Sequence, residues 1–552
     1  MRSFLQNPPR PNNRFRTDRT LRLTLERLLP PEVFAATAPA FDRMGERAVA
    51  ELPPLAWAAE RNPPRHVPYD AWGKRVDRIE TDPAWTRLIA IGQEEGLVAL
   101  PYEAPYGMHS RVVQAGLMQL YDPVSAMASC PLTMTDGAAH VLGRHDPALA
   151  ARYLPRLLAR ADGWTSGQWM TETAGGSDVG RTATVARPAA DGAWTLHGTK
   201  WFTSATSGEI ALALARPEGA EAGSRGLSLF LLELRRPDGS WNGITVRRLK
   251  DKLGTRALPT AELDLDGTVA VPVGGIGRGV GKIASLLNVA RLWASWSGPA
   301  GVGHLLALAR DYATRRDVFG DRLAARPIHR AWLARIAAEY EAMLALVFEA
   351  AAALGRAEHG GDGGLARLLA PLAKIAGARQ GVWAASELVE SFGGAGYIED
   401  TGIPRVLRDV HVHCIWEGTT SVLAADVLRA LADRALVEGY REAVTRRLAG
   451  LRLAETQALV APIEAAMTTL APLLAEPSEA EARRIAIGMA RTLQAALLAE
   501  AAEWRLRERE DATCLAAALL FTRESLVPAA APEVSLDALA LGTLPDASGG
   551  KS

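Results

Sequence analysis

The sequence predicts a mainly α-helical protein with a central antiparallel β domain and a further helical domain at its C-terminal end. Apolar residues recur three and four positions apart before residue 162 and again from residue 282, as in amphipathic helices. Between these regions lie short segments in which apolar and polar residues alternate and which turn residues bound, as in β-strands: GAWTLHGTKWFTSA, EIALALA, GLSLFLLEL, GITVRRL and TAELDLDG. A chain of 552 residues is too long for one hydrophobic core. The expected domains are 1–162, 163–281, 282–435 and 436–552.

The helical regions contain several separate patterns. Before the strands, helical periodicity occurs in LTLERLL, AFDRMGERAVAEL and DPAWTRLIAIGQEEGLVAL. We expect a break between helices in the proline-rich RNPPRHVPYDAWG. The residues from Cys130 to Gly143 predict a further, largely buried helix. After the strands, a long helix is expected from Ile283 to Asp317. The helical periodicity continues in HRAWLARIAAEYEAMLALVFEAAAAL and ARLLAPLAKIAGARQGVWAASELVESFG. Segments of this length predict a bundle of long antiparallel helices. Gly355 to Gly364 is an expected mobile loop within it.

Charge and cysteine content exclude several classes of protein. The 62 basic and 62 acidic side chains cancel, so the whole chain has no bias toward nucleic acid or an anionic membrane. From Leu436 onward, 16 acidic residues outnumber 12 basic ones, which disfavours DNA binding by this region. The three isolated cysteines argue against a disulfide scaffold, a zinc site or an iron–sulfur cluster, and fit a cytoplasmic location. No uninterrupted apolar run approaches the roughly 18 residues of a membrane span.

Two motifs near the first strands have residues suited to a cofactor. In WMTETAGGSDVG, Thr171, Gly175, Gly176 and Ser177 offer hydroxyls and unhindered N–H groups that can cradle a phosphate or the edge of a planar ring. In KWFTSA, which begins at Lys200, an aromatic wall precedes two hydroxyls. Alone, the first motif also fits a common glycine-rich turn, and the second fits an ordinary surface strand.

Two further motifs lie in the helical bundle. RRDVFGDRL, from Arg315 to Leu323, has arginines that can grip a phosphate and Phe319 to lie beside a flat ring. ESFGGAGY, from Glu390 to Tyr397, follows a helix. Alone, the first also fits a positively charged helix C-terminus, and the second a helix C-cap with its turn.

Two other segments imitate functional motifs. GGIGRGVGK, starting at Gly274, lacks the spacing of a nucleotide-binding loop and leaves a β domain, so we interpret it as a domain connector. HVH places His411 and His413 on one face of an expected extended segment, but no third metal ligand is evident nearby. We therefore expect no metal site.

Glu417 is the candidate catalytic residue. It lies in IWEGTTSVLAADVLRAL, between a tryptophan and a glycine and just before a helical pattern. A carboxylate there is either a favourable charge at a helix N-terminus or a base. The sequence of this segment alone leaves both interpretations open.

In their order along the chain, these motifs resemble the acyl-CoA dehydrogenase flavoprotein family. The pattern is MTE-x-x-GGSD, K-W-F-x-S, R-x-x-FG, GG-x-GY, and RD followed by WEGT. The segments NPPRHVPYDAWGKRVDRIETDPAW and CPLTMT, with the extra C-terminal helices, resemble the AidB-type branch. The resemblance implies an N-terminal helical domain, a β-sandwich or barrel, a four-helix bundle and a fourth, helical domain.

The resemblance implies that the chain binds FAD. Met170 and Thr171 would contact the flavin pyrimidine edge, Ser177 the pyrophosphate, and Phe202 the isoalloxazine ring, with Ser204 near N5. The residues expected from this chain are Met170, Thr171, Gly176, Ser177, Phe202, Ser204, Trp416 and Thr419.

The resemblance also implies that a neighbouring subunit completes the FAD site. Arg316 and Phe319 of that neighbour would hold the pyrophosphate and the adenine, and it would add Glu390, Gly393 and Gly394. A cofactor site shared in this way implies a homo-oligomer, and the family's usual form is a dimer of dimers. Relatives often have Gln in place of Glu390, so a carboxylate here weakens the expected dinucleotide affinity.

The resemblance makes Glu417 the base that removes the α-proton of an acyl-CoA thioester. Its own backbone N–H would donate to the thioester carbonyl, enclosure by Trp416 would raise its pKa, and Arg291 and Gly418 would lie beside the substrate. Hydride would pass from the β-carbon to flavin N5, and an electron-transfer flavoprotein would accept the electrons. Nitroalkane-oxidising relatives carry Asp at this position, and Asn288 to Ala290 include no rival carboxylate.

The sequence is also compatible with two other functions. One is an AidB-type flavoprotein that binds or protects DNA, and the other is a protein that binds acyl-CoA without turnover. Six arginines, expected on two neighbouring helices of the last domain, could form a local basic patch: Arg483, Arg484, Arg491, Arg505, Arg507 and Arg509.

Overall fold

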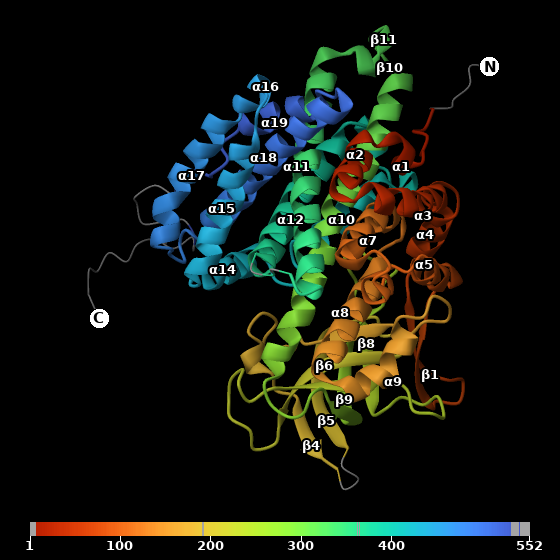
Figure 1. The fold of residues 1–552 in the computed structure, drawn as a ribbon. Helices are drawn as coiled ribbons and strands as arrows, with labels where there is room; N and C mark the ends of the chain where they lie inside the picture. Colours follow the sequence, from red (N-terminus) through yellow and green to blue (C-terminus); the bar gives the residue numbers. More distant parts are fainter. Residues whose placement is uncertain (1–6, 190–192, 362, 364, 531–539, 541–552) are drawn as a thin grey trace, which may run out of the picture.

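A computed structural model describes residues 7–189, 193–361, 363, 365–530 and 540. It has helical layers at both ends of the sequence and one main β-sheet between them, so the expected fold class is confirmed (Figure 1). The division into four domains at 162, 281 and 435 stays a prediction.

The N-terminal region is helical, with one addition. The segment expected to be only a proline-rich break contains an antiparallel hairpin, in which Arg65 pairs with Glu80. Proline in an edge strand is tolerated, because its missing N–H faces solvent, and Pro68 lies in this hairpin. The elements are α1 (Arg14–Thr17), α2 (Arg19–Leu28), α3 (Pro31–Ala50), α4 (Leu52–Arg61), β1 (Arg65–Tyr69), β2 (Arg75–Glu80), α5 (Pro83–Glu94), α6 (Leu100–Glu103), α7 (Ser110–Tyr121), α8 (Ser129–His145) and α9 (Pro147–Leu157).

The main sheet has seven strands in the order β3-β6-β4-β5-β9-β7, and β8 pairs with β9. Most pairings are antiparallel as expected, but β6 pairs in parallel with β3 and with β4. Those partners are not consecutive in sequence, so no hairpin turn indicates their direction. The strands are β3 (Ser166–Trp169), β4 (Val185–Pro188), β5 (Trp194–Ser204), β6 (Ile210–Pro217), β7 (Ser228–Glu233), β8 (Ile244–Leu249) and β9 (Thr260–Pro272).

A helical bundle follows the sheet. Its first helix, α10, has 37 residues and is therefore about 55 Å long. It runs from the β region to the small β10–β11 hairpin (Figure 1). The elements are α10 (Gly279–Arg315), β10 (Asp317–Val318), β11 (Asp321–Arg322), α11 (Pro327–Glu358), α12 (Ala366–Glu390), α13 (Ile403–Val412) and α14 (Thr420–Leu431).

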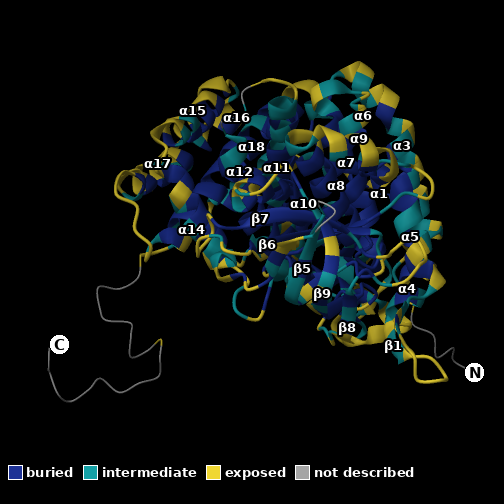
Figure 2. Ribbon diagram, turned by 90° about the horizontal axis from the view of Figure 1, so that it is seen from below, coloured by how far each residue is buried: buried dark blue, intermediate teal, exposed yellow. Residues whose placement is uncertain are grey.

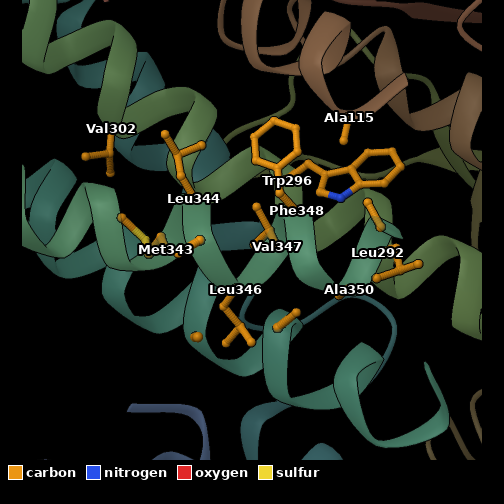
Figure 3. Packing of buried hydrophobic residues seen from close by; sticks show 14 of the residues in the cluster. Ala115, Leu292, Trp296, Val302, Met343, Leu344, Leu346, Val347, Phe348 and Ala350 are labelled. Atoms are coloured by element: carbon orange, nitrogen blue, oxygen red, sulfur yellow. The ribbon is translucent and has the colours of Figure 1, made fainter. Parts of the chain in front are cut away.

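The core of the bundle joins it to the N-terminal helices. Trp296 of α10 and Phe348 of α11 are fully buried and lie near Ala115 of α7 (Figure 3). The centre of the molecule is therefore buried, while its outer helices carry the exposed residues (Figure 2). Two expectations differ from the structure. Helix α11 extends into the expected loop 355–364 and ends at Glu358. His411 is helical within α13 instead of extended, because the preceding apolar residues continue the helical period.

The last helices pack on the bundle through a buried helix. The segment α18 (Ala482–Arg509) lies between the bundle and the outer elements α15 (Arg434–Gly450), α16 (Ala454–Gln457) and α17 (Val460–Ala475). Helix α19 (Thr513–Thr522) packs against both α18 and α11 of the bundle. By length and composition, two helical segments of the described chain could cross a membrane: Ala454–Ala475, whose most apolar window is 28% buried, and α18, whose window is 83% buried. Burial accounts for α18 as a core helix of a folded domain. The absence of a membrane span stays a prediction.

Candidate active site

Glu417 lies in a strained turn just before α14. Its φ is 57°, a left-handed conformation that costs about 1–2 kcal/mol for a residue with a Cβ. Gly418 follows with φ of 103°, where an L side chain would be strained. Thr419 then caps the helix, with its hydroxyl accepting from the Val422 N–H. Strain at a residue of this kind requires surrounding contacts that hold it.

Two buried cations hold the carbonyl oxygens of this turn. Lys374 of α12 donates from Nζ to the Gly418 carbonyl at 2.5 Å. Arg291 of α10 donates from Nε to the Glu417 carbonyl at 3.4 Å and from Nη1 to Asp426 at 2.7 Å. Burial alone would raise the pKa of Asp426, but the hydrogen bond from Arg367 and the charge of Arg291 outweigh it and lower that pKa. Because Arg291 is engaged in this way, its expected substrate contact stays a prediction.

The Glu417 carboxylate is suited to accept a proton. Burial raises its pKa above the ordinary value, and the charge of Arg291, a hydrogen bond from Gln168 and the charge of Lys374 partly oppose that rise. The Gln168 amide of β3 donates to a Glu417 carboxylate oxygen at 3.4 Å. Within the described chain, the Glu417 backbone N–H makes no hydrogen bond to the backbone, so it can donate to a ligand.

The MTE segment and the KWFTS strand lie together, and β3, which leads into the MTE segment, contacts Glu417 through Gln168. The Trp201 N–H donates to the Thr171 carbonyl at 3.0 Å, which places Met170 and Thr171 at the edge of β5. A buried ion pair fixes this junction, because Lys200 donates from Nζ to Glu172 at 2.6 Å. Burial opposes the charge of Glu172, but Lys200 and the Thr184 hydroxyl together lower its pKa.

An aromatic face and a chain of hydrogen bonds follow on β5. Phe202 is 55% exposed, and the Lys250 ammonium lies 4.6 Å from its ring centroid. Ser204 lies 3.1 Å from the Thr260 hydroxyl, which accepts from Lys252 at 3.1 Å. Burial lowers the pKa of Lys252 to about 8.

These residues fit the flavin half of an FAD. The Oε1 atom of Gln168 is buried without a hydrogen-bond partner, and Phe202 offers an exposed aromatic ring nearby in the fold. In the neighbouring turn, a Cβ on Gly175 would lie 2.5 Å from the Asp178 carbonyl oxygen, so the tight turn requires glycine. Gly176 and Ser177 in that turn are exposed, which leaves their N–H groups accessible to a phosphate.

The other expected FAD residues lie at the far end of the bundle. Arg316 and Phe319 follow the C-terminus of α10 and are exposed, Phe319 by 98%. Phe392 lies beside this end, with its ring centroid 5.3 Å from that of Tyr312, and the exposed Glu390, Gly393 and Gly394 flank Phe392.

Helix geometry separates these two groups within one chain. Arg316 lies 25 positions after Arg291, which is about 37 Å along the helix axis. Arg291 contacts the Glu417 turn, so one chain does not bring Arg316 to that turn.

The sequence did not single out Gln168, Lys374 or the Glu172–Lys200 pair. A lysine in the apolar run LLAPLAKIAGA is a signal for a buried cation, since such a group needs a partner. The partner of Lys374 is a carbonyl of the distant Glu417 turn, which no sequence spacing indicates.

The described residues contain no group of three or more His, Cys, Asp or Glu side chains arranged for a metal ion. His413 is buried with neither ring nitrogen hydrogen-bonded, and burial with the nearby Lys374 charge lowers its pKa to about 3. It is therefore neutral at physiological pH and packs edge-on against Trp416.

Three family models match the chain in sequence order. They are the Adaptive response protein AidB N-terminal domain over residues 6–162, the Acyl-CoA dehydrogenase middle domain over 167–268 and the Acyl-CoA dehydrogenase C-terminal domain over 277–432. Fold and site together thus define an oxidoreductase of the helical–β–helical flavoprotein type.

Relatives identify the family more closely. The chain is 39% identical to acyl-CoA dehydrogenase family member 11 of Caenorhabditis elegans, over 90% of this chain and 85% of the relative. It is 34% identical to the putative acyl-CoA dehydrogenase AidB of Escherichia coli, over 70% and 72%. The crystal structure of C. elegans ACDH-11 in complex with C11-CoA has a TM-score of 0.92 and 36% identity, covering 96% of this chain and 94% of that one. The chain belongs to the acyl-CoA dehydrogenase family, in the branch with an AidB N-terminal domain.

Proposed function

We propose that the protein is an FAD-dependent enzyme that oxidises an acyl-CoA to its 2-enoyl-CoA, with Glu417 as the base. The observation that carries this proposal is a carboxylate of raised pKa in a turn held by two cations, beside the residues that fit a flavin. The family typically binds FAD. A relative that is 36% identical was solved with C11-CoA, which supports a medium-length acyl chain.

Glu417 performs the proton transfer in this proposal. Its carboxylate accepts the α-proton, and the C–H bonding pair moves toward the thioester carbonyl. The unbonded N–H of Glu417 is available to donate to that oxygen as negative charge develops. A raised pKa makes the carboxylate a stronger base than a solvated glutamate with pKa of about 4.3.

Residues of β3, β5 and the turn between β3 and β4 would hold the cofactor. Met170 and Thr171 would bind the pyrimidine edge, Phe202 the ring face, Ser204 the N5 region and Ser177 the pyrophosphate. The bound FAD would supply the acceptor for the β-hydrogen and its electron pair, next to Ser204. Trp416 is half-buried beside Glu417 and helps to exclude water from the reacting carbon.

A second copy of the chain would complete the site. The separation of about 37 Å between Arg291 and Arg316 supports this, because Arg316 and Phe319 then serve the FAD of a partner. A dimer, or a dimer of dimers, is therefore part of the proposal. An electron-transfer flavoprotein as acceptor and a cytoplasmic location also belong to it, the latter supported by three free, buried cysteines.

The DNA-binding alternative has less support. All six arginines of the suspected patch lie on the single helix α18, not on two helices as expected, because the helical period continues unbroken between them. Several are neutralised: Arg491 pairs with Glu339, Arg505 with Glu341 and Arg509 with Glu26.

Anaerobic mixing of the purified, FAD-loaded protein with C11-CoA tests the proposal. We expect the oxidised flavin absorbance to be bleached in the wild type. If a panel of acyl-CoAs of different chain lengths binds but leaves the flavin oxidised, the protein is an acyl-CoA-binding protein and the proposal is wrong.

A further inference from the structure

Lys374 is the least expected charge near Glu417. Its side chain comes from the middle of α12, in an apolar stretch, and the residue is 1% exposed. Burying an ammonium without a partner is costly, so its partner indicates what it does. That partner is the Gly418 carbonyl, at 2.5 Å.

The hydrogen bonds of Lys374 and Arg291 together fix two successive peptide groups. Arg291 holds the Glu417 carbonyl and Lys374 the Gly418 carbonyl, from two different helices. These anchors restrain the left-handed backbone of Glu417, whose cost would otherwise favour relaxation of the turn. The direction of the Glu417 side chain depends on that backbone.

We propose that Lys374 is a positioning residue of the dehydrogenation site, which fixes the Glu417–Gly418 turn and places one positive charge behind the catalytic carboxylate. This inference rests on the proposed function of Glu417. Lys374 would not touch the substrate, since its ammonium is bound to the backbone behind the turn.

The charge has a second consequence. Burial of Glu417 raises its pKa, and the charges of Arg291 and Lys374 oppose that rise, so both charges favour the ionised form of the carboxylate. Burial lowers the pKa of Lys374 itself to about 8, against the opposing charge of Glu417, so it remains mostly protonated at pH 7.

Apart from Arg291, the groups nearest to Glu417 add no second charge of this kind. Gln168 on β3 is neutral, Cys130 on α8 has a pKa raised by burial, and His413 is neutral at physiological pH. Arg291 also lowers the pKa of Glu417, and its guanidinium is shared with the Asp426 carboxylate. It stays in place when Lys374 is replaced, so a Lys374 variant reports the contribution of Lys374 alone. Lys252, near Cys130, donates to Leu258 and Thr260 instead.

The chain offers a matched control in Lys282. This lysine is also nearly buried, and its ammonium likewise holds backbone carbonyls, those of Val273, Gly274 and Gly275. It lies at the start of α10, beside the connector after β9. Lys282→Met therefore removes a similar lysine without touching the Glu417 turn.

The test is a pH titration of the infrared band of the protonated Glu417 carboxyl in the FAD-loaded protein, assigned by its loss in Glu417→Gln. Lys374→Met should raise the midpoint by about one pH unit, the usual size of a lost neighbouring charge. Lys374→Arg should restore most of the wild-type midpoint, and Lys282→Met should leave it unchanged. Should Lys374→Met not fold, Lys374→Gln carries the same expectation.

Turnover gives an independent reading. The acidic limb of the pH profile of kcat/KM should move to higher pH by the same amount in Lys374→Met. An unchanged infrared midpoint in that variant, or an equal shift in Lys282→Met, overturns the inference. A wild type that does not oxidise acyl-CoA overturns the proposed function instead, while the infrared titration still tests Lys374.

Discussion

The Glu417 turn and the far end of α10 differ in how far one chain completes them. At the turn, the buried Lys374 and Arg291 already hold the backbone, and the half-buried Gln168 contacts the carboxylate. At the far end, Arg316 and Phe319 are exposed, and the guanidinium of Arg316 makes no ion pair within the described residues. The half of the proposed site that carries Glu417 is thus preorganised within one chain. The half expected to bind the adenine end of FAD would be completed only when a second copy of the chain binds.

The largest effect is expected at the preorganised half. Glu417→Gln removes the base but keeps the shape of the side chain, so kcat should fall by about 10²- to 10⁴-fold, the usual contribution of a general base. Binding of FAD and C11-CoA, measured by fluorescence titration, should persist. The exposed Glu438→Gln on α15 is the control and should retain wild-type turnover. Full activity in Glu417→Gln would remove Glu417 from the mechanism.

The next effect concerns the junction that supports the flavin residues. Lys200→Met leaves the buried Glu172 carboxylate without its cation, which should lower the free energy of unfolding by about 3 kcal/mol in a denaturant titration. Adding Glu172→Gln should recover part of that loss, since the uncompensated charge is gone. The exposed pair Arg187–Glu218 is the control, and Arg187→Met should change the free energy of unfolding by less than about 1 kcal/mol. Equal losses in both lysine and arginine variants would contradict a special role for the buried pair.

A moderate effect is expected at the exposed half. Arg316→Ala should raise the Kd for FAD by about 10- to 100-fold, as for the loss of one charged hydrogen bond to a phosphate. The unfolding midpoint of the FAD-free protein should not change, because Arg316 is exposed. Arg441→Ala, exposed on α15, should leave FAD affinity at the wild-type value. Wild-type affinity in Arg316→Ala would mean that this end of the bundle does not reach the cofactor.

The smallest effect is expected at Glu390. We expect this exposed carboxylate to face the pyrophosphate of a partner's FAD, where solvent and salt screen the repulsion between the two negative charges. Glu390→Gln removes that repulsion and should lower the Kd for FAD by roughly threefold. The affinity should be compared at low and high salt, because the difference should shrink as salt screens the charge. Weaker FAD binding in this variant would show that Glu390 contributes a favourable contact instead.

Local patterns predicted the helices and the position of the β region, and the resemblance to the family supplied the residues of the proposed site. Helical period and turn residues are local properties, so α8 and α10 appear close to where they were expected. The parallel pairing of β3 with β6 was not predicted, because it joins strands far apart in the chain. Lys374 and Gln168 were missed for the same reason, since their partners in the Glu417 turn are distant in sequence.

A mixed-subunit experiment tests the division of the site between two chains most directly. Glu417→Gln and Arg316→Ala chains are co-expressed with different tags, and mixed oligomers are isolated and assayed with C11-CoA at an FAD concentration that leaves Arg316→Ala largely empty. If each site takes Glu417 from one chain and Arg316 from its partner, a mixed dimer holds one site with both residues intact, and its turnover should exceed that of either parent. Mixed oligomers no more active than the parents would contradict the account.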